Sequence, residues 1–133
     1  MSNAGYILVV DDDGLFTQFM KDVLEKGFDR EVVTADSLQE ALQRVQSRIP
    51  ALIFFDLNLP DGDGEQFCRE ISKITEKKTV PKWILSGVSP LFGDLKKWVE
   101  YGVEGYLVKP VPIDTIFNAV RKSLPDAGER RSS

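Results

Sequence analysis

The sequence predicts an α/β fold in which a doubly wound, five-stranded parallel sheet carries helices on both faces. Short apolar runs alternate along the 133 residues with longer segments whose apolar residues recur at the helical period. The two clearest runs, Tyr6–Val10 and Ala51–Phe55, are apolar throughout, which is typical of strands covered on both sides. Because parallel strands need a crossover connection, this alternation predicts five strand–helix units with right-handed crossovers.

The other three strands are predicted from weaker patterns. Glu31–Ala35 is rich in β-branched residues but more polar, as expected of an edge strand. Trp83–Leu85 and Tyr106–Val108 are short apolar runs of the same kind as the first and third strands. One strand is therefore expected before each predicted helix.

Five amphipathic stripes with a period near 3.6 residues predict the helices. The stripes consist of Leu15, Phe16, Phe19, Met20, Val23 and Leu24; Leu38, Ala41, Leu42, Val45 and Ile49; Phe67, Ile71 and Ile74; Leu91, Leu95 and Val99; and Ile113, Phe117, Val120 and Leu124. Ser37 followed by Glu40 forms a capping box for the second helix, and Pro50 ends that helix before the third strand. Cys68 is expected to be a small buried residue rather than a reactive thiol.

The composition excludes several classes of chemistry. The chain has no histidine and one cysteine, which excludes His-based catalytic triads, zinc sites built from His or Cys, and an intramolecular disulfide. Lys and Arg number 17 against 21 Asp and Glu, and the resulting charge of −4 opposes binding to nucleic acid or to an anionic membrane. No apolar run approaches the roughly 18 residues of a membrane span, and the N-terminus does not resemble a signal peptide. We therefore expect a cytoplasmic protein.

Charged and hydroxyl side chains stand where the predicted strands end. Asp11, Asp12 and Asp13 follow the first strand, Asp56 the third, Ser86 the fourth and Lys109 the fifth. Ligands of such sheets bind beyond the carboxyl ends of the strands, so these residues are expected to meet in one pocket.

Carboxylates gathered in one pocket repel one another unless a proton or a cation neutralises them. Mg²⁺ prefers oxygen ligands and takes one or two protein carboxylates, so we expect it at Asp12 and Asp56, with Asp11 close by. Six acids, namely Asp11, Asp12, Asp13, Asp56, Asp61 and Asp63, cluster around two predicted strand ends and are expected to set up this cation site. Among them, Asp13 is interpreted as a solvated acid or a cap of the first helix, where the helix dipole favours negative charge.

A metal ion beside a carboxylate and a lysine also suits phosphoryl transfer. The two cations neutralise the transferred group while a carboxylate oxygen acts as the nucleophile. At the strand ends the sequence reads ILVVDDDG, LIFFDLNLPDGDG, WILSG and GYLVKP. These four motifs, in this order, resemble the receiver domain of two-component response regulators over about residues 5–124.

The resemblance implies a flavodoxin-like (βα)₅ three-layer sandwich with strand order 2-1-3-4-5. It also implies that Asp56 is the phosphoacceptor, which forms an aspartyl phosphate. Mg²⁺ would be held by Asp11, Asp12, Asp56 and the backbone carbonyl of Asn58. The phosphate would come from a phosphohistidine on a sensor histidine kinase or a phosphotransfer protein, since this chain has no histidine.

The resemblance further implies a switch. The hydroxyl of Ser86 and the ammonium of Lys109 would bind the phosphoryl group, and Tyr106 would turn inward as Ser86 moves. The Lys109–Pro110 peptide bond is expected to be cis. The surface of the fourth helix, fifth strand and fifth helix would then change for an unknown output domain or target protein. Candidate residues on it are Phe92, Lys96, Trp98, Tyr106, Phe117 and Arg121.

Two other interpretations stay open. Asp11–Gly14 also fits the DxDG signature of haloacid-dehalogenase-like phosphatases, with Asp11 as nucleophile and Asp13 as acid/base. A receiver can also serve as a phosphate-independent docking module.

The expected role is a phosphoacceptor signalling domain. It is expected not to be an enzyme, except that it catalyses its own phosphorylation and dephosphorylation. Residues 1–4 are expected to be a flexible N-terminus or a cloning remnant, and residues 125–133 a flexible tail or a linker to an output domain.

Overall fold

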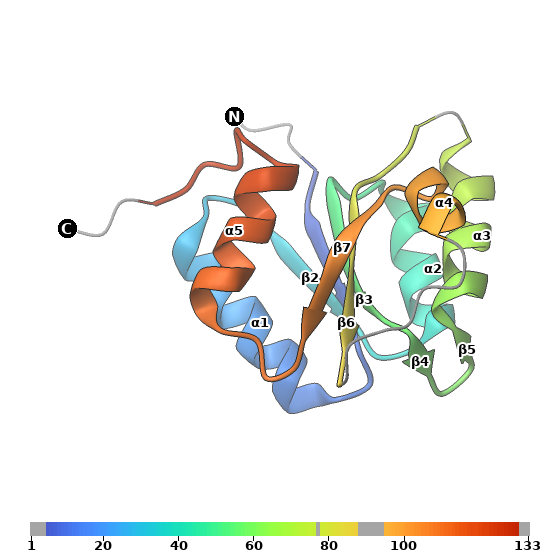
Figure 1. Cartoon of the computed structure of the whole chain (residues 1–133), viewed down its shortest axis with the longest axis horizontal. Coiled ribbons are helices and arrows are strands. Elements are labelled where there is room, and N and C mark those ends of the chain that lie inside the picture. Colours follow the sequence, from blue (N-terminus) through green and yellow to red (C-terminus); the bar gives the residue numbers. More distant parts are fainter. Residues whose placement is uncertain (1–4, 77, 88–94, 131–133) are drawn as a thin grey trace.

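A computed structural model of the chain describes residues 5–76, 78–87 and 95–130. Within these residues a five-stranded parallel sheet has the order β2-β1-β3-β6-β7 (Figure 1). Its strands are β1 (Ile7–Val10), β2 (Val32–Ala35), β3 (Leu52–Asp56), β6 (Lys82–Ser86) and β7 (Val103–Val108). Numbered as the five strands that the sequence predicts, this order is 2-1-3-4-5, so the doubly wound fold and its strand order are confirmed.

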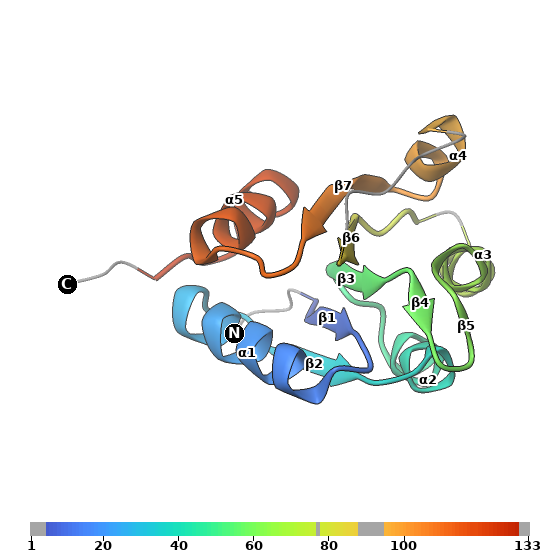
Figure 2. The same ribbon diagram turned by 60° about the horizontal axis from the view of Figure 1, so that its bottom comes forward.

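Helices cover both faces of the sheet and complete a three-layer sandwich (Figure 2). One face carries α1 (Gly14–Gly27) and α5 (Ile113–Ser123). The other carries α2 (Leu38–Ser47), α3 (Gly64–Thr75) and the short α4 (Leu95–Glu100). Among the described segments, none of the helices has the length and apolar character needed to cross a membrane.

Each face of the sheet buries its own apolar cluster. In β1, Ile7 and Val9 point into the cluster under α1 and α5, whereas Leu8 and Val10 point into the cluster under α2 and α3. All four are fully buried. This burial on both faces explains why β1 reads as an unbroken apolar run. Cys68 is buried in the second cluster, as expected.

Polar side chains begin three of the helices. Asp13 is the N-cap of α1, Ser37 that of α2 and Asp63 that of α3, and each accepts a hydrogen bond from a backbone N–H in the first turn. The Glu40 carboxylate in the predicted capping box accepts from the N–H of Asp36 rather than from that of Ser37.

The strand pattern differs from the prediction at two places. A small antiparallel hairpin, β4 (Asn58–Leu59) and β5 (Gly62–Asp63), lies between β3 and α3. In addition, β7 begins three residues before the predicted run. The prediction missed this start because Glu104 and Gly105 interrupt the apolar pattern of the strand. A Cβ at Gly105 would lie 2.6 Å from the ring of Trp83, so the strand carries a glycine where that ring packs.

Residues 125–130, which belong to the predicted tail or linker, pack against the end of α1. The Asp29 N–H donates to the Gly128 carbonyl at 2.7 Å, and the Arg130 N–H donates to the Gly27 carbonyl at 2.7 Å. Ala127 is buried in the cluster under α1 and α5. The Glu129 carboxylate also accepts from the Arg121 guanidinium on α5. The polar composition of the segment does not reveal these contacts.

Candidate functional site

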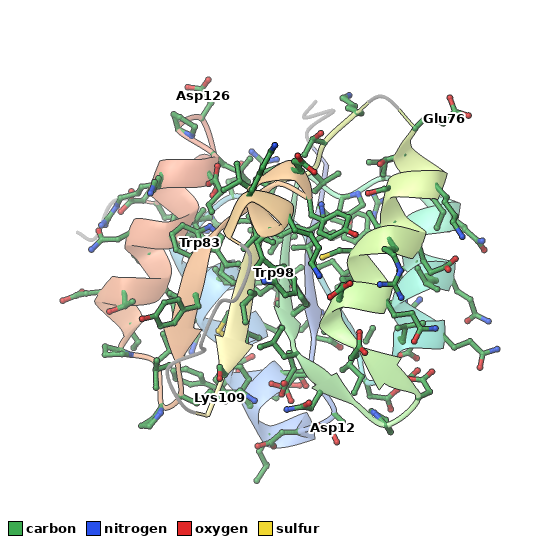
Figure 3. The ribbon with its side chains drawn as sticks, turned by 45° about the vertical axis from the view of Figure 1, so that its right-hand side comes forward. Asp12, Glu76, Trp83, Trp98, Lys109 and Asp126 are labelled. Carbon is green, nitrogen blue, oxygen red and sulfur yellow. The ribbon has the colours of Figure 1, made fainter. Side chains whose placement is uncertain are left out.

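Three aspartates converge at the carboxyl ends of two neighbouring strands. Asp11 and Asp12 follow β1 directly, and Asp56 is the last residue of β3, which pairs with β1. One carboxylate oxygen from each lies within 4.8 Å of the others. Asp12 and Lys109 lie at the same end of the sheet, and Asp126 lies at the opposite end (Figure 3). The structure therefore brings Asp11, Asp12 and Asp56 together at one end of the sheet, as the sequence predicts.

The Lys109 ammonium lies between two of these carboxylates. Its Nζ is 2.5 Å from Asp11 Oδ2 and 3.0 Å from Asp56 Oδ2. Partial burial alone would lower the pKa of Lys109, but the carboxylates of Asp11 and Asp56 outweigh burial and raise it. The ammonium also lies 4.8 Å from the ring centre of Phe16 on α1, within cation–π range.

Asp11 is the fully buried member of the group. Its Oδ1 accepts the Asp13 N–H at 3.0 Å. Its Oδ2 forms the ion pair with Lys109 but has no hydrogen bond of good geometry among the described residues. Burial raises the pKa of Asp11, and the Lys109 ammonium and the Asp13 N–H oppose that rise only in part. A second cation near Oδ2 would stabilise the charged form of this carboxylate.

Asp56 is half-buried and presents both oxygens to the site. Its Oδ1 accepts the Asn58 N–H at 2.9 Å, while Oδ2 accepts from Lys109. Asn58 itself is exposed and lies in β4, directly after the strand end. The carboxylate is therefore oriented at each oxygen by a separate donor.

The donor set fits a hard divalent cation. It consists of carboxylate oxygens at several depths, with Asp11 buried, Asp56 half-buried and Asp12 exposed. The buried Oδ2 of Asp11 lacks a well-formed hydrogen bond, and exposed Asp12 leaves the cluster open to solvent. Mg²⁺ binds through one or two carboxylates and keeps several waters, which matches a cluster open on one side.

Two further predicted residues lie on β6 and β7, the two strands that follow β3 across the sheet. Ser86 ends β6, the strand that pairs with β3, and is buried. Its carbonyl accepts the Lys109 N–H at 2.7 Å, so the backbones of Ser86 and Lys109 adjoin. Tyr106 lies on β7, pairs with Ile84 and is 40% exposed. The Lys109–Pro110 bond is cis, as expected.

The predicted surface of α4, β7 and α5 is only partly exposed. Lys96, Tyr106 and Arg121 are exposed, whereas Trp98 and Phe117 pack partly buried against the two apolar clusters. Phe92 lies outside the described residues.

The six acids predicted to surround one cation site divide into two groups. Asp13 and Asp63 are helix caps, and the Asp61 carboxylate accepts two backbone N–H groups from the start of α2. Asp13 thus caps the first helix, as expected, and among the described residues the carboxylates that approach one another are those of Asp11, Asp12 and Asp56. A helix N-terminus attracts a carboxylate as a cation does, so composition alone does not separate the two roles.

Comparison with known proteins agrees with this geometry. The family model described as "Response regulator receiver domain" matches residues 7–121. This chain belongs to the response regulator receiver family. It is 34% identical over 118 residues to the KDP operon transcriptional regulatory protein KdpE of Escherichia coli, and that match covers 89% of this chain and 50% of KdpE.

Two other proteins are similar to this chain along nearly their full length. The chain is 26% identical over 118 residues to the chemotaxis protein CheY of Bacillus subtilis, with 89% of this chain and 96% of CheY covered. A crystal structure of a two-component response regulator from Clostridium difficile matches with a TM-score of 0.79 and 26% identity, covering 92% of this chain and 97% of that one. This receiver thus spans half of one curated relative and almost all of another.

The geometry of this receiver argues against the phosphatase interpretation. That interpretation needs Asp11 as a nucleophile and Asp13 as an acid/base. Asp11 is fully buried and ion-paired, and the Asp13 carboxylate accepts the Leu15 and Phe16 N–H groups at 3.1 and 3.2 Å.

The sequence did not predict the contact between Phe16 and Lys109 or the contacts of Asp61 with α2. Both depend on side-chain geometry between separate elements.

Proposed function

We propose that this receiver accepts a phosphoryl group on Asp56 from the phosphohistidine of a sensor histidine kinase or phosphotransfer protein, and signals through the resulting change of its surface. The observation that carries the proposal is the position of the Lys109 ammonium, which contacts both Asp56 and Asp11. A phosphoryl group entering at Asp56 would meet a cation and a cluster of metal-binding carboxylates at once.

In the proposed transfer, an oxygen of Asp56 attacks the phosphorus while the bond from phosphorus to the histidine nitrogen breaks. The electron pair of that bond stays on the imidazole, and the product is an aspartyl phosphate. The Asn58 N–H, at 2.9 Å from Oδ1, orients the Asp56 carboxylate before the transfer. Lys109 offsets the negative charge of the incoming group at short range.

Mg²⁺ would be held by Asp11, Asp12, Asp56 and the backbone carbonyl of Asn58, where it would offset negative charge on the phosphoryl oxygens. Asp11 is ionised in that role, and its ion pair with Lys109 supports this state at 2.5 Å. The half-buried setting of Asp56 limits access by water while still admitting a donor.

The output step would begin at Ser86. Its hydroxyl would hydrogen-bond the new phosphoryl group, and the exposed ring of Tyr106 would turn toward the space that Ser86 leaves. Both residues lie on the last two strands of the sheet, β6 and β7. A partner that prefers the altered surface would then bind the phosphorylated receiver, with the output domain or target protein as that partner.

The test is labelling by acetyl phosphate in the presence and absence of Mg²⁺, followed by intact-mass measurement. We expect the wild type to gain one phosphoryl group only with Mg²⁺, and Asp56→Asn to gain none while remaining folded. Asp22→Asn, which changes an exposed aspartate of α1, is the control and should label as the wild type does. Labelling of Asp56→Asn at Asp11 would support the phosphatase instead, and absence of both labelling and Mg²⁺ binding in the wild type would support a docking module.

A further inference from the structure

Asp61 connects the loop after Asp56 to a helix that is distant in sequence. It stands in the turn of the β4–β5 hairpin, and its Oδ1 accepts the Leu38 N–H at 2.7 Å while its Oδ2 accepts the Gln39 N–H at 2.9 Å. These are the first two N–H groups of α2. Hydrogen bonds from Gln39 and Leu38 lower the pKa of Asp61, so the carboxylate is charged where the helix N-terminus favours an anion.

Asp61 caps α2 from a distant part of the chain. Ser37 Oγ is the N-cap and accepts the Glu40 N–H at 3.1 Å, which leaves the Leu38 and Gln39 N–H groups for another acceptor. The Asp61 contact adds two hydrogen bonds that reach across 22 and 23 positions of sequence, so it constrains the hairpin as much as the helix.

The hairpin is also packed closely against α2. A Cβ at Gly62 would lie 2.8 Å from Leu38 Cδ1, so the hairpin backbone lies directly on the first residue of the helix. Leu59, on the opposite strand of the hairpin, is buried beside Leu38 in the same cluster. Moving the turn away from α2 would therefore disturb packing and hydrogen bonds together.

The far end of the same hairpin reaches the phosphoacceptor. Asn58 pairs with Asp63 across the hairpin, and its N–H donates to Asp56 Oδ1 at 2.9 Å. The Gly64 N–H donates to the Leu57 carbonyl at 2.8 Å and closes the loop at its base. The hairpin is thus held at its base and at its turn, and Asn58 lies between these two points.

We propose that Asp61 is a positioning residue of the cation site: by fastening the hairpin turn to the start of α2, it sets the position of the Asn58 backbone carbonyl. This inference rests on the proposed function, in which that carbonyl is a ligand of Mg²⁺. Residues that orient a metal ligand without binding the metal typically weaken metal affinity by 10- to 100-fold when they are removed. We expect the lower end of that range here, a loss of about 10-fold.

The experiment measures the Mg²⁺ dissociation constant of the full chain by calorimetric titration, with thermal unfolding recorded on the same samples. Asp61→Ala removes both hydrogen bonds to α2 and should weaken Mg²⁺ binding about 10-fold. Ser37→Ala is the matched control, because it removes a cap from α2 while leaving both hydrogen bonds between Asp61 and α2 in place. It should lower the melting temperature while leaving the Mg²⁺ dissociation constant unchanged.

Asp61→Asn separates position from charge. It removes the negative charge but keeps one oxygen that can accept an α2 N–H, so positioning predicts a smaller loss of affinity than in Asp61→Ala, one that persists in high salt. Equal losses in the two variants that vanish in high salt would assign the effect to charge and overturn the inference.

Three further outcomes would overturn it in different ways. If the wild type binds Mg²⁺ and Asp12→Asn weakens that binding, but Asp61→Ala does not, the inference fails while the proposed function stands. If the wild type binds no Mg²⁺, both fail together. An equal loss of affinity in Ser37→Ala and Asp61→Ala would show that the stability of α2, rather than the hairpin, is responsible.

Discussion

The Lys109 ammonium forms ion pairs with Asp11 and Asp56 at 2.5 and 3.0 Å, and so joins the ends of the first, third and last strands of the sheet. Asp11 is fully buried, whereas the Lys109 side chain is 22% exposed. In the absence of a metal ion, Lys109 is the cation that the structure provides for this buried carboxylate.

Replacing Lys109 should therefore destabilise the fold in a metal-dependent way. Breaking a fully buried ion pair costs about 3–5 kcal/mol, and the partial exposure of Lys109 reduces our expectation for Lys109→Ala to about 2 kcal/mol. Saturating Mg²⁺ should recover part of this loss, because a cation bound to the folded state neutralises the same carboxylates. Urea unfolding with and without Mg²⁺ measures both effects.

The exposed Lys96 supplies the control for that experiment, since Lys96→Ala should change the stability little in either condition. A loss in Lys109→Ala that is the same with and without Mg²⁺ would contradict the view that the ammonium and the metal neutralise one group of carboxylates.

Lys82, unlike Lys109, is a buried cation, and backbone carbonyls accept its hydrogen bonds. Its Nζ donates to the carbonyls of Val80 at 2.8 Å and Tyr101 at 2.6 Å, joining β6 to the end of α4. Burial lowers the pKa of Lys82. We expect Lys82→Ala to cost about 3 kcal/mol, because it leaves a cavity and two carbonyls without their donor.

Lys82→Met keeps most of the side-chain volume and should cost less, about 1–2 kcal/mol. Lys73→Ala on the exposed face of α3 is the control in the same denaturation series. A Lys82→Met variant more stable than the wild type would mean that burying the ammonium costs more than its two hydrogen bonds contribute.

Tyr6 should make the folding stability of the protein fall at alkaline pH. Its hydroxyl donates to the Arg44 and Arg48 carbonyls at the end of α2, and burial raises its pKa from 10.0 to about 12. The folded state therefore keeps a proton that the unfolded state loses, so this contribution is complete below pH 10 and disappears as the pH rises toward 12.

Tyr6→Phe should be less stable than the wild type at pH 8, and the difference should shrink between pH 10 and 12. Chemical denaturation at a series of pH values measures this difference. The Cys68 thiol, whose pKa burial also raises to about 12, contributes to every variant and cancels in the difference. A Tyr6→Phe profile parallel to the wild type would contradict the assignment.

Gly105 should not tolerate a side chain. The Cβ of Gly105→Ala would lie 2.6 Å from Trp83 Cζ3, and the Trp83 indole is held by its hydrogen bond to Ser123 Oγ at 2.7 Å. We expect a loss of about 1–3 kcal/mol by thermal unfolding. Gly14→Ala has no atom within 4 Å of its new Cβ and should be neutral or stabilising, and equal effects of the two changes would be inconsistent with this packing.

The fold was predictable because its signals are local and strong. Fully buried strands such as β1 leave an uninterrupted apolar run, and the helices between them show clear stripes. The site followed from topology, since parallel strands bring their carboxyl ends to one edge. Receiver membership, and with it the expected roles of Asp56 and Lys109, required the resemblance to known motifs.

The remaining features depend on geometry that residue patterns do not encode. Asp61 and Asp12 are both acids in loops at the same edge of the sheet, but one meets two N–H groups of α2 and the other lies among carboxylates. The hairpin β4–β5 is too short to leave a pattern. The contacts of residues 125–130 include backbone hydrogen bonds, the buried Ala127 and the ion pair between Arg121 and Glu129, none of which the sequence pattern indicates.

The central claim is that Asp56 carries the phosphoryl group, and mapping the modified residue tests it most directly. The wild-type chain would be treated with acetyl phosphate and Mg²⁺, reduced with borohydride, which converts an aspartyl phosphate to homoserine, and sequenced by tandem mass spectrometry. We predict homoserine at position 56 alone, and none when Mg²⁺ is omitted. Homoserine at position 11, or none at any position in a sample that binds Mg²⁺, would contradict the claim.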